Sequence, residues 1–280
     1  MINFKNYNKN INESHSFHMV DTSPFPFMTS LALLSLVLSF ISYFHYFKGG
    51  AYHFIISFSI LVFYLFRWFS DIVVESTYEG HHTFKVQQGI RLGMCLFIVS
   101  EIFFFFSFFW GFFHCSLSPG MSIGFIWPPL SISTLNPFGL PLWNTVILLS
   151  SGVTVTVAHR AIIAGERNST TNGLIATILY GIIFTFIQGY EYNNALFSIN
   201  DSVFGSLFFM LTGFHGFHVL VGTIFLIVCL YRQINYHFTR RQHVGLEACI
   251  WYWHFVGLIW LVYYMNKYIH YFKKILINLL

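Results

Sequence analysis

Charged side chains are scarce in this chain of 280 residues, where Asp, Glu, Lys and Arg together make up 9%. Ordinary soluble domains carry about 25%. Hydrophobic residues reach 56% and aromatic residues 21%. The composition therefore excludes a soluble globular domain and predicts an all-α protein that crosses a membrane several times. The formal net charge of +4 is attributed to topology and lipid headgroups, so we expect no nucleic-acid partner.

Cysteine is equally rare, with four residues and no Cys-x-x-Cys pair. All four lie in or beside apolar stretches, where free cysteine behaves as a small hydrophobic side chain. This usage argues against a disulfide framework and a thiolate metal site. The chain also lacks an internal repeat, which argues against the inverted-repeat transporter folds.

Seven apolar stretches are each long enough to cross about 30 Å of hydrocarbon. They are residues 28–47, 52–69, 92–113, 140–163, 173–190, 203–231 and 248–269. A polar connector, residues 70–88, separates the second stretch from the third. We therefore expect an N-terminal segment (1–27), a two-helix hairpin (28–69), the connector, a five-helix bundle (89–269) and a C-terminal tail (270–280).

Positive charges are unevenly shared between the two sides of these spans. With seven crossings, ten of the 14 Lys and Arg residues fall on the side of the N-terminus. By the positive-inside rule, this side faces the compartment of synthesis, and the C-terminus lies across the membrane.

A carboxylic acid, Glu101, lies inside the most apolar stretch. Placing an acidic residue at the centre of a membrane helix costs roughly 2.5 to 3.5 kcal/mol on insertion scales, which makes it a candidate functional residue. Its neighbours three and four positions away are Phe97, Ile98, Phe104 and Phe105, none of which pairs with a charge. Any partner must come from another helix.

Two histidines, His215 and His218, share one face of the sixth span. They have the spacing of metal ligands, but a catalytic metal would need a third ligand and an open position. The preferred interpretation is that they hydrogen-bond to facing helices or to Glu101, while Gly213, Gly216 and Gly222 permit close packing. The string Trp251-Tyr252-Trp253-His254 is interpreted as an interfacial aromatic belt.

Several strings occur together, in a fixed order along the chain. They are Glu75-Ser76-Thr77-Tyr78-Glu79-Gly80-His81-His82-Thr83, Ser100-Glu101, Phe108-Phe109-Trp110-Gly111-Phe112-Phe113-His114, Trp127-Pro128-Pro129, Thr212 to His218 and Trp251-Tyr252-Trp253-His254-Phe255. Over roughly residues 15–265 the chain resembles the cytochrome c oxidase subunit III family of the haem-copper oxidases.

The resemblance implies a seven-helix subunit in which two helices and a five-helix bundle border a cleft that holds phospholipid. It implies no catalytic residue, metal or redox cofactor in this chain. Haem a, haem a3 and copper would belong to subunits I and II of respiratory complex IV, which oxidises cytochrome c, reduces oxygen to water and pumps protons. Accessory subunits would be further partners. The expected location is the mitochondrial inner membrane, with the N-terminus in the matrix and the C-terminus in the intermembrane space.

The resemblance also assigns roles to single residues. Glu101, with His215 and His218, would support proton uptake and the durability of the enzyme. Contacts to lipid headgroups and acyl chains would come from Trp68, Glu75, Ser76, Thr77, His82, Trp110 and Arg232. The chain departs from the family pattern at Arg67, which is displaced, and at Gly257, where a carboxylate is usual.

Three alternatives remain open from the sequence. Subunit III of a quinol oxidase would share the fold. A proton-coupled transporter would explain an intramembrane carboxylate near histidines, but should show broken helices and a polar pathway. A haem-binding electron-transfer subunit would place His159 opposite His215 or His218.

Overall fold

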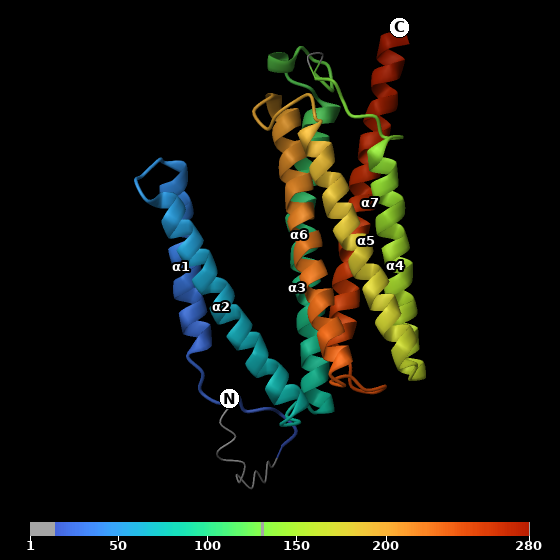
Figure 1. Ribbon diagram of the computed structural model, residues 1–280. Helices are drawn as coiled ribbons and strands as arrows, with labels where there is room; N and C mark the ends of the chain where they lie inside the picture. The colour runs from blue at the N-terminus through green and yellow to red at the C-terminus, as the bar shows by residue number, and fades with distance from the viewer. Residues whose placement is uncertain (1–14, 130–131, 280) are drawn as a thin grey trace. The chain divides into compact units, whose positions relative to one another are not determined.

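The computed structural model describes residues 15–129 and 132–279, with the side chains of residues 122 and 267–279 left out. Every regular element in these ranges is a helix (Figure 1). The elements are α1 (Phe25–Phe44), α2 (Gly50–Thr77), α3 (Phe84–Leu117), a 3₁₀ turn η1 (Met121–Ile123), α4 (Leu140–Ala164), α5 (Arg167–Asn193), α6 (Ser202–Ile234) and α7 (Val244–Leu279).

Seven of these helices are long and apolar enough to cross a membrane. The prediction of seven spans is therefore confirmed. Several helices extend beyond the predicted apolar stretches: α2 continues to Thr77 and α3 begins at Phe84. A helix satisfies its own backbone hydrogen bonds and can continue into the polar zone, so only residues 78–83 of the polar connector are non-helical.

Proline and glycine mark several helix ends. Pro26 and Pro141 lie in the first turns of α1 and α4, where the missing amide proton is not needed. Gly165 follows α4 with φ +84°, a left-handed conformation that favours glycine, and its amide closes the last turn on Ala161 and Ile162. Local sequence thus sets where these helices start and stop.

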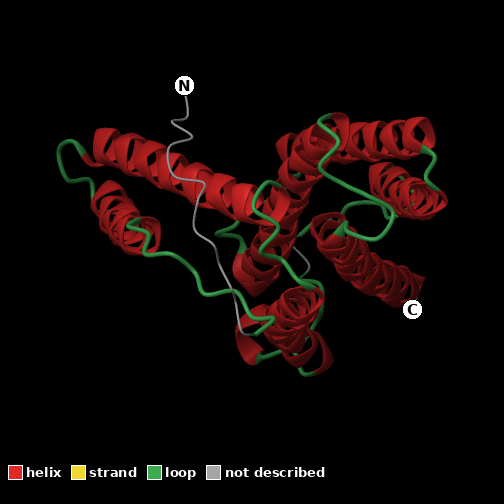
Figure 2. Ribbon diagram, turned by 90° about the horizontal axis from the view of Figure 1, so that it is seen from below, coloured by secondary structure: helices red, strands yellow, loops and turns green. Residues whose placement is uncertain are grey.

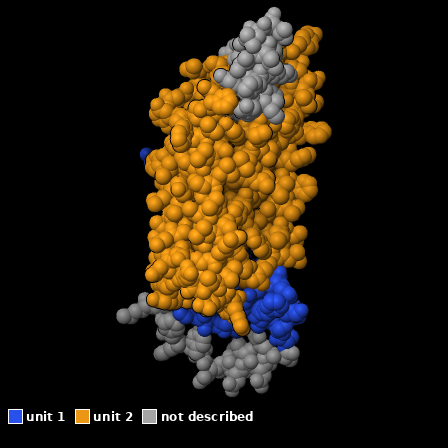
Figure 3. Space-filling model, turned by 90° about the vertical axis from the view of Figure 1, so that its right-hand side faces the viewer, with its two compact units in different colours: residues 1–90 blue, residues 91–280 orange. Residues whose placement is uncertain are grey.

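The chain divides into two compact units, residues 1–90 and residues 91–280, which are coloured separately in Figure 3. In unit 1, α1 packs along α2. The hydroxyl oxygens of Ser35 and Ser57 are 2.8 Å apart across this contact. Most large apolar side chains of these two helices are exposed, as expected for surfaces that face lipid or other subunits.

Unit 2 contains the main core. Within it α4 packs on α5, α5 on α6, α6 on α7, and α7 on α4. Figure 2 shows the helices of the chain, joined by loops, in a view turned by 90° from Figure 1. Trp253 and Trp260 of α7 lie almost fully inside this arrangement, and their indole N–H groups donate to Ser151 and Thr145 of α4, each at 2.9 Å. Trp253 is only 2% exposed, so its assignment to an interfacial belt was wrong: the indole finds its polar partner on a neighbouring helix instead of in the headgroup region.

Candidate functional site

The carboxyl group of Glu101 on α3 meets the imidazole of His218 on α6. Glu101 Oε2 lies 2.8 Å from His218 Nε2. The other ring nitrogen, Nδ1, is 2.6 Å from the carbonyl oxygen of Phe214, one helical turn earlier. The prediction that a partner for Glu101 comes from another helix is therefore confirmed.

The hydrogen bonds limit where protons reside in this pair. A carbonyl oxygen only accepts, so His218 Nδ1 carries a proton and donates it to Phe214. The contact between Nε2 and Oε2 then needs one more proton, carried either by the carboxyl or by the imidazole. In both arrangements the pair is neutral overall, which lowers the cost of placing it among apolar helices.

Aromatic rings pack against the His218 imidazole of this pair. The rings of Phe105 and Tyr252 lie 5.0 and 6.3 Å from the His218 imidazole, centroid to centroid. The side chain of His218 is 10% exposed in this chain and that of Glu101 is 21% exposed. One carboxyl oxygen is thus held by α6, while part of the group remains open at the surface of unit 2.

His215 is separated from this pair. It is 3% exposed and packs against the rings of Phe184 and Trp260, at 5.7 and 5.2 Å. Among the described residues neither of its ring nitrogens has a hydrogen-bond partner, and no hydrogen bond or ion pair joins it to Glu101. Positions i and i+3 differ in direction by about 60° around a helix, so the two imidazoles reach different neighbours.

The structure does not support a metal bound by His215 and His218. Neither belongs to a group of three metal-ligating side chains among the described residues. The expected role of the nearby glycines holds for one of them: a Cβ on Gly222 would lie 3.0 Å from Trp253, whereas Gly213 and Gly216 face open space. Close packing therefore centres on Gly222.

Five of the seven predicted lipid contacts belong to unit 1. Trp68, Glu75, Ser76 and Thr77 lie on the last three turns of α2, and His82 lies in the connector that follows. All five side chains are half-buried. Their grouping places a cluster of polar side chains at one end of an otherwise apolar pair of helices.

Trp110 and Arg232 belong to unit 2 and lie towards opposite ends of it. Trp110 is 65% exposed near the end of α3, and Arg232 lies in the last turn of α6 with its guanidinium 4.5 Å from the Phe238 ring centroid. These helices run antiparallel, because the end of α3 and the start of α6 line one cavity. A single lipid headgroup therefore cannot contact both residues.

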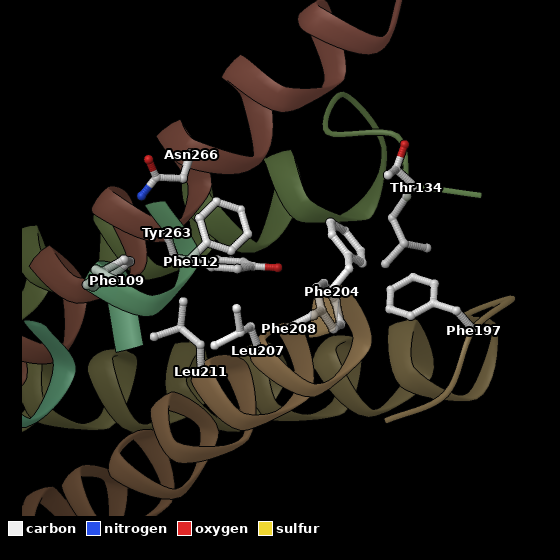
Figure 4. Close-up of a pocket in the computed structure, with 11 residues that line it drawn as sticks. Phe109, Phe112, Thr134, Phe197, Phe204, Leu207, Phe208, Leu211, Tyr263 and Asn266 are labelled. Atoms are coloured by element: carbon white, nitrogen blue, oxygen red, sulfur yellow. The ribbon is translucent and has the colours of Figure 1, made fainter. Parts of the chain in front are cut away.

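That cavity is small and apolar (Figure 4). Its volume is about 30 Å³. Its lining includes the rings of Phe109 and Phe112 of α3, Phe204 and Phe208 of α6, and Tyr263 of α7. It has room for one water molecule or a methyl group, which excludes it as a substrate site.

Comparisons with known proteins agree with this architecture. The chain matches the family described as "Cytochrome c oxidase subunit III" over residues 15–272. The chain belongs to this family. It is 50% identical to cytochrome c oxidase subunit 3 of Marchantia polymorpha over 258 residues, which are 92% of this chain and 97% of the relative. The same protein of Anopheles gambiae is 50% identical over 255 residues, or 91% of this chain and 97% of the relative.

The subunit III chain contains a second polar cluster that sequence reasoning missed. Arg91 of α3 donates from Nε to Glu247 Oε2 of α7 at 2.7 Å and from Nη2 to Oε1 at 3.2 Å. Glu247 also lies 3.4 Å from His243, whose ring stacks edgewise on that of His159. The sequence showed these residues only as charges at span ends, because nothing in a linear chain indicates which ends meet.

Proposed function

We propose that this chain acts as a non-catalytic core subunit of mitochondrial cytochrome c oxidase, in respiratory complex IV. It would support proton uptake, bind lipid and stabilise the catalytic subunits while electrons pass from cytochrome c to oxygen. Its partners would be subunits I and II, which would carry haem a, haem a3 and copper, together with accessory subunits. The observation that carries this proposal is the Glu101–His218 hydrogen bond of 2.8 Å between α3 and α6.

The Glu101–His218 pair has the properties of a proton store. It holds one exchangeable proton between a carboxyl oxygen and an imidazole nitrogen, two groups that readily exchange protons. Aromatic rings shield the imidazole, and the carboxyl is partly open at the surface. A proton lost to a neighbouring subunit would leave an uncompensated charge in apolar surroundings, so rapid reprotonation is favoured.

The lipid role rests on where the polar side chains gather. We assign headgroup contacts to Glu75, Ser76, Thr77 and His82 at the end of α2. Trp68 lies two helical turns before Glu75 on the same face of α2, so it would contact the acyl chains. Trp110 and Arg232 would contact lipid at opposite ends of unit 2. The arrangement of a two-helix hairpin and a five-helix bundle around a lipid-holding cleft is part of this proposal.

The proposed orientation places the N-terminus in the matrix and the C-terminus in the intermembrane space of the mitochondrial inner membrane. The uneven distribution of Lys and Arg supports it. Relatives named as cytochrome c oxidase subunits favour cytochrome c over quinol as the electron donor. The transporter alternative loses weight because each of the seven spans is a continuous helix in the described ranges.

The Glu101→Gln variant tests the proton role. Glutamine keeps the size of the side chain and can still donate a hydrogen bond to His218 Nε2, but it has no exchangeable acid proton. We expect the assembled oxidase to take up protons more slowly and to lose activity sooner during turnover. Both are measured in reconstituted vesicles, by pH-indicator dyes and by oxygen consumption over time.

Glu166→Gln provides the matched control, since the Glu166 side chain is exposed and its carboxylate accepts a hydrogen bond from the Ser169 hydroxyl in the first turn of α5. The control should behave like the unmodified oxidase. Equal proton uptake and equal working lifetime in the Glu101→Gln enzyme would refute the proposed role of the pair.

A further inference from the structure

Three side chains of unit 1 converge at the end of α2. Glu75 lies in the last turn of that helix, His82 lies in the connector, and His18 lies in the segment that precedes α1. One ligand atom from each of them, a carboxylate oxygen and two imidazole nitrogens, lies within 4.8 Å of the other two. The three residues are half-buried, so the cluster is reachable from outside.

Two imidazoles and one carboxylate are a donor set that binds zinc in proteins with one coordination position left open. In tetrahedral coordination with bonds of about 2.0–2.1 Å, the ligand atoms would lie roughly 3.4 Å apart. The observed spacing of at most 4.8 Å exceeds this value by no more than about 1.4 Å. The set also suits other divalent transition metals, whereas calcium and magnesium prefer oxygen ligands alone.

The backbone around Glu75 and His82 is held in place. The amide of His81 donates to the Glu75 carbonyl at 3.0 Å, and Gly80 adopts φ +71° between them, a left-handed conformation that lets the chain turn back. The buried Gln87 side chain donates to the His82 carbonyl at 2.9 Å. Hydrogen bonds therefore hold the backbone that joins Glu75, in the last turn of α2, to His82 in the connector.

The segment that carries His18 is fastened to the same turn. The Thr83 hydroxyl donates to the Ser16 carbonyl at 2.5 Å. The His18 ring stacks on that of His81, with centroids 4.6 Å apart and planes 10° from parallel. These contacts bring His18, which lies 57 positions before Glu75, to the cluster, where one of its ring nitrogens lies within 4.8 Å of the other two ligand atoms.

We propose that His18, Glu75 and His82 form a binding site for a divalent transition-metal ion of the zinc type. The bound ion fastens the segment before α1 to the turn between α2 and α3. This role goes beyond the proposed lipid contacts, because His18 is not one of them.

The test measures zinc bound to the purified oxidase that contains this chain. Complexes with the unmodified chain or with His18→Ala, Glu75→Gln or His82→Ala are dialysed against buffered Zn²⁺, and bound metal is counted by mass spectrometry. We expect the affinity of this site for Zn²⁺ to fall at least about 10-fold in each variant. At a free Zn²⁺ concentration that just saturates the unmodified complex, each variant should therefore bind up to one zinc ion fewer per complex.

His15→Ala and Glu79→Gln are matched controls. His15 is an exposed histidine of the same segment, and Glu79 is a carboxylate of the same turn that faces His81 at 3.3 Å. Both should keep the zinc content of the unmodified complex. His18→Ala should also keep its phospholipid content, which separates failure of the metal site from failure of the lipid role. Equal zinc content and affinity in His18→Ala and the unmodified complex would overturn the proposal.

A second measurement covers variants that fail to assemble. Hydrogen–deuterium exchange of the unmodified complex is recorded with and without Zn²⁺. Zinc should slow exchange in residues 15–23 and in residues 78–83 over the same concentration range, because one ion links both segments. Unchanged exchange in both segments would contradict the site.

Discussion

At the scale of single residues, two carboxylates have basic partners on other helices. Glu101 has His218, and Glu247 has Arg91. An unpaired charge would cost several kcal/mol at membrane depth, so the pairing of Glu101 offsets a cost that the sequence alone makes visible. His215 is different, because it is buried among Phe184 and Trp260 and, in the described part of the chain, lacks a hydrogen-bond partner.

His237, in the loop between α6 and α7, predicts a pH dependence of stability. Burial and the nearby positive charge of Arg232 hold the pKa of His237 below its ordinary value. The unfolded chain, with a histidine pKa of about 6.5, then binds more protons than the folded chain. Above about pH 6.5 the imidazole is neutral in both states and does not lower the free energy of unfolding. Below this pH the unfolded chain takes up the proton more readily, so the free energy of unfolding falls as the pH is lowered.

His237→Gln should therefore flatten the loss of thermal stability between about pH 7 and pH 5. The unfolding temperature of the purified complex, followed across this range, measures the effect. Arg232→Gln removes one of the two causes and should reduce the same dependence in part. An identical pH profile for His237→Gln and the unmodified chain would exclude this contribution.

At the scale of helices, small residues decide how closely the core helices approach. A Cβ on Gly181 of α5 would lie 2.7 Å from the Thr223 hydroxyl of α6 and 2.8 Å from the Trp253 ring of α7. No real Cβ tolerates such distances without movement of its neighbours, and Trp253 is held by its hydrogen bond to Ser151. The contact of three helices at this point therefore depends on a glycine.

Gly181→Ala should lower the free energy of unfolding by about 1–3 kcal/mol, the usual cost of overpacking a core. Gly189→Ala on the same helix is the matched control, because a Cβ there meets nothing within 4 Å. Alanine is the better helix former by up to about 1 kcal/mol, so the control should be neutral or stabilising. Equal unfolding temperatures for the two variants in detergent would contradict this prediction, because the neighbours of Gly181 would then move enough to accept a methyl group.

At the scale of the whole molecule, the exposed apolar surface predicts stable association with lipid and with other membrane subunits. Side chains such as Phe66, Phe103 and Trp110 are more than half exposed along the spans, a surface suited to lipid and to the flanks of other membrane subunits. A subunit of an oxidase complex should therefore not be recovered alone.

Gentle purification through a tag on this chain should recover haem a absorbance in a reduced-minus-oxidised spectrum, together with a copper-containing subunit II identified by mass spectrometry. Dissociation of the partners should remove the haem from the tagged chain. A colourless single protein would favour a transporter, and haem retained after dissociation would favour an electron-transfer subunit.

The sequence by itself determined the membrane class, the seven spans and the family. Bilayer thickness sets a minimum length for apolar runs, so spans are visible without tertiary information. An acidic residue in such a run is equally visible, which is why Glu101 stood out. Ordered motifs along nearly the whole chain indicated the family.

Only the tertiary structure decided which side chains meet. His215 and His218 look equivalent in sequence, yet helix rotation directs one into the core and the other to Glu101. The sequence predicts an interfacial position for Trp253, whereas the structure shows that its indole N–H donates to Ser151 of α4. The cluster of His18, Glu75 and His82 brings His18 to two residues that lie 57 and 64 positions after it in the chain. Such contacts depend on how helices pack and on which distant segments the fold brings together. Neither produces a periodic pattern in the sequence.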